Sequence, residues 1–375
     1  MFEQVILSYN DLEIRISDYA DEDIIYLLKN TVIGSEREMR YSIQNVEERI
    51  NAYKDRIRFI SLYKKGQFAG TIGACFRITG QGILRFSSFY FRYLAFQSYY
   101  QTNLLSSGEK KRQPGAGKED SFKHKVLEVL NKPDLFNIKD FHEGERYIMY
   151  AFIESMNERS KNLVHQAGYE HVRSFLTVAF SRFSPASHPE VSLLKEEERP
   201  LMSELLNEYY RDYSLFTTDY AFFNDKYYVL KEDEEIIGGV CAIPSVYKIH
   251  NIPGVWGWVI MKILPHVPYF RRLFQPGEFR FLVFDAVYCK KGKEKKLSKL
   301  FESVCAAEGF NTGLTWLDDR SELYDKLRME VKMGALNRML NAKPVLVYIR
   351  FGNFQEKEKD PFYECPAYIS GFDFS

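Results

Sequence analysis

Two short stretches of the sequence carry residues of the kinds that bind anions and move protons. The first, "RQPGAGK", places Arg112 and Lys118 around Gly115, Ala116 and Gly117. Glycines let a backbone approach a phosphate closely, and the N-terminus of a following helix offers unpaired N–H donors and positive dipole charge. This stretch is a candidate phosphate site. The alternative is a polar loop, rich in Gly and Lys, that matches a phosphate-binding motif by accident.

The second stretch, "SMNERSKNLVHQAGY", joins the apolar runs "YIMYAF" and "FLTVAF". It predicts a polar helix that begins after Asn157 and ends before Gly168. Candidate proton-transfer groups close to it in sequence are Glu154, His165 and Tyr169, and the aromatic stretch further upstream adds two tyrosines, Tyr93 and Tyr99. The structural alternatives are a helix cap for Glu154, a surface position for His165 and a core position for each tyrosine.

Composition and charge bound the class of protein. Lys plus Arg equals Asp plus Glu at 51 each, so no net field draws the chain to nucleic acid. The five cysteines are scattered without C-x-x-C spacing, which favours reduced thiols and predicts no metal site. We see no signal peptide at the N-terminus and expect a cytoplasmic protein. The most apolar segment, residues 255–274, contains Lys262 and two prolines, and we expect it not to span a membrane.

The pattern of elements repeats along the chain. A strand at 12–16, helices at 19–30 and 45–56, a hairpin over 58–78, a strand at 146–152, the polar helix and a strand at 175–183 form the first series. Similar segments follow in the same order, and 168 residues separate Gly70 from Gly238 and Arg182 from Arg350. We predict an α+β protein of two tandem domains, 1–186 and 187–375.

This order of elements resembles the GCN5-related N-acetyltransferase (GNAT) family. The last helix of that family often begins N-x-x-A and ends in G-F, and here Asn157, Ser160, Gly168 and Tyr169 occupy those places. The resemblance implies two acyl-CoA N-acyltransferase-like domains, each a mixed, mostly antiparallel sheet flanked by helices. It also implies that Arg112, Gly115, Ala116, Gly117, Lys118 and Asn157 bind acetyl-CoA or another acyl-CoA.

The resemblance implies transfer of an acyl group, most simply acetyl, to a small-molecule or peptide amine. Such transfer needs a base for the amine and an acid for the leaving thiolate, for which we name Glu154 and Tyr169. The family's usual tyrosine, seven residues after the asparagine, is replaced by Val164. In the second half, Glu294 replaces the second glycine, which predicts a degenerate domain. Two alternatives stay open: a non-catalytic binding or scaffold protein, and a tandem transferase like the FemABX enzymes.

Overall fold

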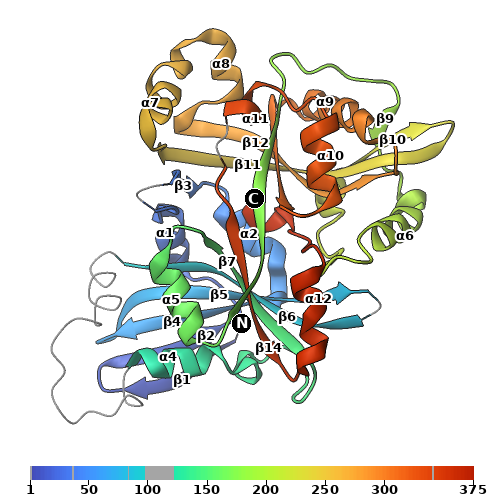
Figure 1. Cartoon of the computed structure of the whole chain (residues 1–375). Helices are drawn as coiled ribbons and strands as arrows, with labels where there is room; N and C mark the ends of the chain where they lie inside the picture. Colours follow the sequence, from blue (N-terminus) through green and yellow to red (C-terminus); the bar gives the residue numbers. More distant parts are fainter. Residues whose placement is uncertain (1, 36–37, 83, 98–121, 340–341) are drawn as a thin grey trace.

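The computed structural model describes residues 2–35, 38–82, 84–97, 122–339 and 342–375 (Figure 1). The elements of the first half are β1 (Glu3–Tyr9), β2 (Leu12–Ser17), α1 (Glu22–Asn30), β3 (Arg40–Ile43), α2 (Val46–Tyr53), β4 (Ile57–Lys64), β5 (Gln67–Gln81), β6 (Leu84–Phe96), α4 (Phe122–Leu130), β7 (Tyr147–Glu154), α5 (Glu158–Gln166) and β8 (Glu170–Ser181). Those of the second half are β9 (Val191–Leu193), α6 (Arg199–Tyr209), β10 (Tyr227–Glu232), β11 (Glu235–Asn251), α7 (Gly254–Lys262), α8 (Pro268–Leu273), β12 (Phe279–Cys289), α9 (Leu297–Glu308), β13 (Thr312–Asp318), α10 (Glu322–Glu330), α11 (Ala335–Met339), β14 (Val345–Gly352) and α12 (Glu356–Glu364).

One mixed, mostly antiparallel sheet runs through both halves of the chain. Its order is β1-β2-β4-β5-β6-β7-β14-β8-β13-β12-β11-β10-β9, and β3 pairs with β11. The late strand β14 therefore lies between two strands of the first half, pairing with β7 on one side and β8 on the other. Figure 1 shows β8 and β14 side by side through the middle of the molecule. The division of the chain near residue 186 stays a prediction.

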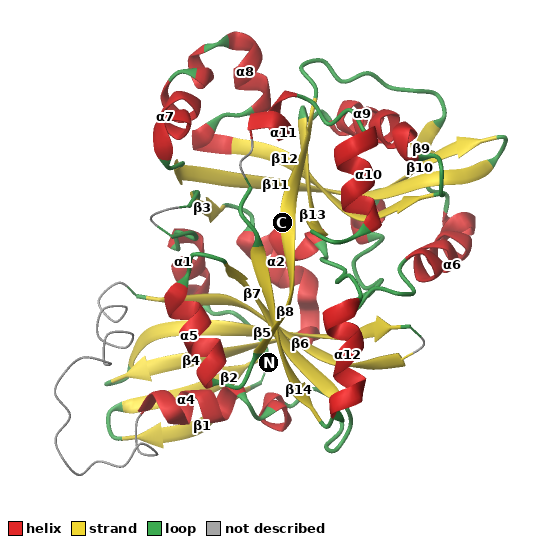
Figure 2. Cartoon of the chain, in the orientation of Figure 1, coloured by secondary structure: helices red, strands yellow, loops and turns green. Residues whose placement is uncertain are grey.

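The apolar alternation of the strands explains how helices cover both faces of the sheet. In β5, Cys75 packs with α1 and α2 residues, whereas its neighbours Ala74 and Phe76 belong to the cluster on the opposite face. In β12, Phe281 shares the first cluster and Phe284 packs against α9. Successive strand side chains point to opposite faces, so each strand contributes to two cores. Figure 2 shows the helices arranged around these strands.

Most predicted elements are present, with two corrections. The Lys-Lys-Gly turn joins β4 and β5 as a hairpin, and Asp21 caps α1 by accepting from the backbone N–H of Ile24 at 2.8 Å. The strand predicted at 12–16 is β2, which the sequence pattern did not show to be paired with β1. The sequence pattern over residues 320–336 predicts a helix that ends near Gly334, but α10 ends at Glu330, because Val331 is extended and the Met333 carbonyl accepts from the Ser181 N–H.

In the part of the chain that the structure describes, no helix is long and apolar enough to cross a membrane. Over the same ranges, no group of three or more His, Cys, Asp or Glu side chains is placed to hold a metal ion.

Candidate active site

The candidate site begins where two parallel strands separate. Strands β6 and β7 pair in parallel from Ser87 with Tyr147 to Phe91 with Ala151. Beyond this point β6 continues to Phe96 and β7 to Glu154 without pairing with each other. Where two neighbouring strands separate, the backbone N–H and C=O groups that face the gap have no strand partner and can bind a ligand.

A large cavity opens at this separation. Its volume is about 1470 Å³, which exceeds the roughly 300–1,000 Å³ typical of small-molecule sites. Its walls come from the ends of β6 and β7, from α1, β3 and α5, and from β8, β13 and α7 of the central and second-half sheet. Most of the lining side chains are apolar or aromatic, including Ile153, Phe152, Trp316, Ile260 and Phe374. The cavity therefore suits a long ligand with a large apolar part.

Glu154 lies in the wall of this cavity at the end of β7. Burial, together with a hydrogen bond to Glu38 and repulsion from it, raises the pKa of Glu154 to about 8. Glu38 is itself buried at 9% exposure, and the Ser35 hydroxyl donates to its carboxylate at 3.3 Å. Two carboxyl groups that share a site cannot both ionise easily, so this pair holds a proton near neutral pH. A base with a pKa near the working pH is well matched to proton transfer.

A β-bulge in β6 borders the same cavity. Thr71 pairs with Ala95 and Gly73 with Arg92, so Tyr93 and Leu94 together face only Ile72. Tyr93 takes a positive φ of 58°, which is uncommon for a bulky residue. Bulges of this kind re-aim side chains and leave one residue out of the ladder. Both bulge residues line the cavity.

The hydroxyl of Tyr93 is buried and has no hydrogen-bond partner among the described residues. Its ring lies under the guanidinium of Arg92, whose Cζ is 4.1 Å from the ring centroid. A buried hydroxyl without a partner costs folding free energy. Tyr93 is thus a polar group held within the wall that also contains Glu38, Glu154 and Asn157.

Asn157 and Tyr169 both line the cavity from α5 and its ends. Asn157 caps the helix, because its side-chain oxygen accepts from the Ser160 N–H at 3.1 Å. The cap considered for Glu154 is thus made by Asn157. Tyr169 is buried in the core cluster formed with α4 and β7, and burial raises the pKa of its phenol well above 10. The roles of Asn157 in coenzyme binding and of Tyr169 in catalysis stay predictions.

Of the remaining sequence candidates, some lie outside the described residues and one lies away from the cavity. Arg112, Gly115, Ala116, Gly117, Lys118 and Tyr99 lie outside the described residues, so the predicted phosphate site stays a prediction. His165 is exposed on α5, with its Nε2 3.5 Å from the Tyr348 hydroxyl, and it does not line the cavity. Val164 does line the cavity, at the place where the resembled family has a tyrosine.

Sequence reasoning missed several residues of the site. Glu38 is 116 positions from Glu154, and nothing in the local pattern joins them. Tyr41 stacks on Tyr247 with centroids 4.6 Å apart, and burial and the nearby Glu154 raise the pKa of Tyr41. Arg92 was the one available signal, because it is a lone charged residue within the apolar run "FYFRYLAF". Arg92 is buried, and its guanidinium donates to the Tyr53 hydroxyl at 2.7 Å.

The second half has a matching opening. Strands β12 and β13 pair in parallel only at Leu282 with Gly313 and Val283 with Leu314. The same bulge recurs in β12, where Ala286 has a positive φ of 47° between the pairs that Asp285 and Tyr288 make with β11. The two halves thus repeat the separated strands and the bulge beside them.

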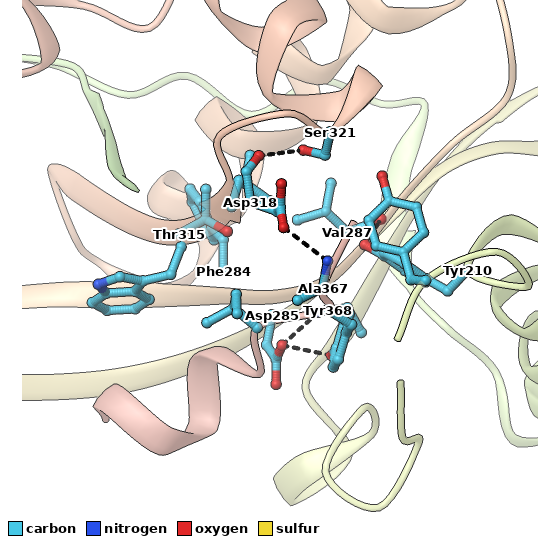
Figure 3. Close-up of a pocket in the computed structure, with 14 residues that line it drawn as sticks. Tyr210, Phe284, Asp285, Val287, Thr315, Asp318, Ser321, Ala367 and Tyr368 are labelled. Atoms are coloured by element: carbon cyan, nitrogen blue, oxygen red, sulfur yellow. Dashed lines mark hydrogen bonds between the residues drawn. The ribbon is translucent and has the colours of Figure 1, made fainter. Parts of the chain in front are cut away.

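The chain itself fills this second opening (Figure 3). Asp285 accepts from the Tyr368 hydroxyl at 2.8 Å, the Gly371 N–H at 2.9 Å and the Ser370 hydroxyl at 3.0 Å. Asp318 accepts from the Ala367 N–H at 2.9 Å. The remaining cavity is about 10 Å³, roughly the space of one water molecule.

In the turn before α9, N–H and ammonium groups donate to carboxylates of the protein itself. The Glu294 carboxylate accepts from the Gly292 N–H at 3.1 Å, in the place where a bound phosphate would take that donor. Of the three lysines in this turn, Lys290, Lys291 and Lys293, the first pairs with Glu235 of β11 and the last with Glu232 of β10. Burial opposes ionisation of Glu294, yet backbone N–H groups and nearby lysines lower its pKa.

Comparisons with known proteins find structural relatives. No family model matches the sequence, and no curated protein matches it. Saccharomyces cerevisiae N-myristoyltransferase with bound myristoyl-CoA superposes with a TM-score of 0.58 at 10% identity, covering 93% of this chain and 85% of that one. Another structure of that enzyme, with bound myristoyl-CoA and inhibitors, gives 0.58 at 10% identity over 92% and 81%.

A GCN5-related N-acetyltransferase from Kribbella flavida matches at a TM-score of 0.47 and 9% identity, over 92% of this chain and 72% of that one. Identities near 10% show a common fold and nothing finer. The predicted fold class is confirmed: the chain shares the fold of N-myristoyltransferase, with a mixed, mostly antiparallel sheet flanked by helices.

Proposed function

We propose that the protein is an acyl-CoA-dependent N-acyltransferase whose active site is the cavity at the separated ends of β6 and β7. The observation that carries this proposal is the position of Glu154, a carboxyl with a pKa of about 8 at the end of β7, in the wall of a 1470 Å³ cavity. The fold relatives with bound myristoyl-CoA support it.

The ligand geometry that we propose follows from the separated strands. The thiol arm of acyl-CoA would enter between β6 and β7, where neither strand pairs with the other beyond Phe91 and Ala151. Asn157 and the N-terminus of α5 would lie beside the coenzyme, because N–H donors and positive dipole charge gather there. The segment Arg112 to Lys118 would contact the pyrophosphate. The Tyr93 hydroxyl would donate to a polar group of the ligand.

The reaction that we propose needs a base for the acceptor amine and an acid for the leaving thiolate. Ionised Glu154 accepts a proton from the acceptor ammonium, directly or through one water, and the neutral amine attacks the thioester carbonyl carbon. A C–N bond forms, the C–S bond breaks, and the thiolate takes a proton from Tyr169, which we keep as the proposed acid. The nitrogen of the tetrahedral intermediate gives up its second proton, which returns through water to the Tyr169 phenolate, and Glu154 releases the first proton to solvent. A thiol with a pKa near about 8.5 is a fair leaving group, so the acid matters less than the base.

The size and lining of the cavity favour a long acyl chain over acetyl. Apolar side chains extend from Phe152 and Ile153 to Ile260 and Leu264 of the second half. Each buried methylene contributes about 0.8 kcal/mol, so an acyl chain that fills this space would bind far more tightly than acetyl. The acceptor is proposed only as an amine, of a small molecule or a peptide.

The test is release of free CoA thiol from acetyl-CoA, octanoyl-CoA and myristoyl-CoA with a panel of amines. We expect saturable release that depends on both partners and is fastest with a long acyl chain. Glu154→Gln should lower turnover by roughly a hundredfold or more and leave acyl-CoA affinity nearly unchanged.

A second candidate function is acyl-CoA or lipid binding without transfer, which Val164 at the family's tyrosine position favours. The same assay separates the two. Tight acyl-CoA binding without thiol release across the amine panel would support the binding protein and contradict transfer. We also propose that the second half binds no coenzyme, because its opening holds the C-terminal segment and Glu294 takes the Gly292 N–H.

A further inference from the structure

The helix α7 is apolar on all sides although it lies at the surface. Its sequence, "GVWGWVIMK", has a single charged residue, Lys262, at the last position. Val255, Val259 and Ile260 line the cavity, whereas Trp258, which is 59% exposed, does not. A helix that is apolar all round is normally buried. We therefore expect the exposed face of α7 to contact another apolar surface.

The exposed apolar surface continues into α8. Between the two helices, Ile263 is 44% exposed and Val267 is 37% exposed, and Tyr269 at the start of α8 is 66% exposed. We call these four side chains, Trp258, Ile263, Val267 and Tyr269, the α7–α8 patch. Figure 1 shows α7 and α8 at an outer edge of the molecule, beside β11 and β12. Exposed apolar side chains gathered in one short segment are typical of a surface that contacts an apolar partner or phase.

Three cations accompany the patch. Lys262, Arg271 and Arg272 are all exposed, and none of them forms an ion pair with any residue that the structure describes. The segment from residue 252 to residue 278 contains one acidic residue, Glu278, at its last position. This local charge differs from the whole chain, which carries equal numbers of acidic and basic residues. The segment therefore joins exposed apolar rings to unpaired positive charge.

We propose that the α7–α8 patch docks the protein onto the surface of an anionic phospholipid membrane. Trp and Tyr side chains are favoured at the level of the lipid headgroups, where one end of the ring is apolar and the other is hydrated. Cations beside them each raise the affinity for an anionic lipid surface by about fivefold. Helices of nine and six residues are far too short to span the bilayer, so they lie in the interface.

The charge argument selects a membrane over a protein partner. Three exposed cations with one acid in the segment suit a surface of many anionic headgroups, and no shape-matched groove is needed. Apolar rings between the cations can then enter the boundary between headgroups and acyl chains. Docking does not depend on the proposed acyl transfer, although the two agree.

The patch also lies next to the candidate site. Ile260, Leu264 and Phe270, from the same two helices and the turn between them, line the cavity from inside. The inner face of α7 and α8 thus lines the cavity, and their outer face is the one that would contact the membrane. Under the proposed function, docking would bring the apolar end of the cavity close to the membrane. Only this link between docking and the cavity rests on the proposed function.

The experiment is sedimentation of the full chain with vesicles. Two compositions are compared, phosphatidylcholine alone and phosphatidylcholine with phosphatidylserine, each at low and high salt. We expect the protein to sediment with the anionic vesicles and to be released as salt rises, because salt screens the headgroup charge. Arg271→Glu with Arg272→Glu should lower the partition coefficient by more than about tenfold.

The apolar contribution has its own variant, Trp258→Ser with Tyr269→Ser, for which we expect a loss of roughly tenfold. Matched controls lie on other faces: Lys291→Glu with Lys295→Glu for charge, and Tyr26→Ser with Met329→Ser for exposed apolar side chains. Both controls should bind as the wild type does, and circular dichroism checks that each variant is folded.

Two results would overturn the proposal. One is a wild type that sediments no more with anionic vesicles than without them. The other is vesicle binding that both patch variants keep at the wild-type level. Neither result concerns CoA thiol release with soluble substrates, so a failure of docking and a failure of acyl transfer are distinguishable.

Discussion

The guanidinium of Arg77 in β5 and the carboxylate of Asp373, close to the last residue of the sequence, form a bidentate ion pair with N···O distances of 2.7 and 3.1 Å. Both side chains are 1% exposed. The Tyr53 hydroxyl also donates to Asp373, at 3.2 Å, and Asp373 belongs to the cavity wall. The pair fixes the C-terminal segment to the first half beside the candidate site.

We predict that Asp373→Leu lowers the free energy of unfolding by roughly 3–5 kcal/mol, because it leaves the Arg77 charge buried without a partner. Adding Arg77→Met should restore part of the loss, since no unpaired charge then remains. Urea denaturation measures both. Glu47→Gln, which breaks the exposed Lys29–Glu47 pair, is the control and should change stability by less than about 1 kcal/mol. Equal losses in the single and double variants would show that packing, and not charge, accounts for the effect.

The raised pKa of Glu154 predicts how stability changes with pH. A glutamate in an unfolded chain has a pKa of about 4.3, whereas burial and Glu38 raise that of Glu154 to about 8 in the folded protein. Between these values the folded state holds the extra proton, so stability falls as pH rises from about 4.3 through 8. Glu154→Gln should remove this fall and gain on the order of 3 kcal/mol over the wild type at pH 9.

Thermal unfolding of both proteins from pH 5 to 9 is the measurement, with Glu145→Gln as a control for a carboxylate elsewhere. Parallel curves for wild type and Glu154→Gln would contradict the raised pKa. In activity, Glu38→Gln should move the rising limb of kcat/KM with pH toward lower pH, because it removes a charge that opposes ionisation of Glu154. An unmoved limb would mean that another group is the base.

Much of the fold follows from local patterns. Period-2 apolar runs and the Lys65-Gly66 turn predict β4 and β5, and the asparagine and glycine around α5 predict that helix to within a residue of its ends. The place of β14 between β7 and β8 does not follow, because strand order depends on contacts across almost 200 residues. Apolar alternation fixes which side of a strand is buried and leaves its neighbours open.

Some residues of the candidate site could also be predicted from the sequence, and others could not. Glu154, Asn157 and Tyr169 are close together in sequence, so their common wall could be predicted. Glu38, which raises the pKa of Glu154, comes from a distant segment, as does Phe374. Such pairings arise from tertiary packing and leave no mark on either segment. The filled second opening is also invisible in sequence, because residues 366–372 have no motif of their own.

Asn157 can be tested in its two roles with two substitutions. Asn157→Ala removes the acceptor for the Ser160 N–H and should lower the free energy of unfolding by about 1 kcal/mol. Asn157→Asp keeps the cap, so stability should hold, while its charge should weaken acyl-CoA binding severalfold by repelling the pyrophosphate. Chemical denaturation and calorimetry separate the two effects. Unchanged acyl-CoA affinity in Asn157→Asp would leave Asn157 with a capping role alone.

The unpartnered hydroxyl of Tyr93 gives a contrast with Tyr169. Tyr93→Phe removes a buried hydroxyl without a partner, so stability should stay equal or rise. If this hydroxyl contacts the ligand, acyl-CoA affinity should fall by about fivefold to tenfold. Tyr169→Phe should instead leave affinity alone and lower kcat by roughly tenfold, as expected for the proposed acid. Reversal of these two patterns would exchange the proposed roles.

The most direct test of the account is calorimetric titration of the protein with a series of acyl-CoAs, from acetyl-CoA through octanoyl-CoA to myristoyl-CoA. We predict one site per chain and an affinity that rises by at least tenfold from the shortest to the longest chain, because the cavity buries methylenes. Thr177→Phe, in the cavity wall on β8, should remove most of that rise, whereas Ile78→Phe, exposed on β5, should keep it. Failure to bind any acyl-CoA, or equal affinity across the series in all three proteins, would contradict an acyl-CoA site in this cavity.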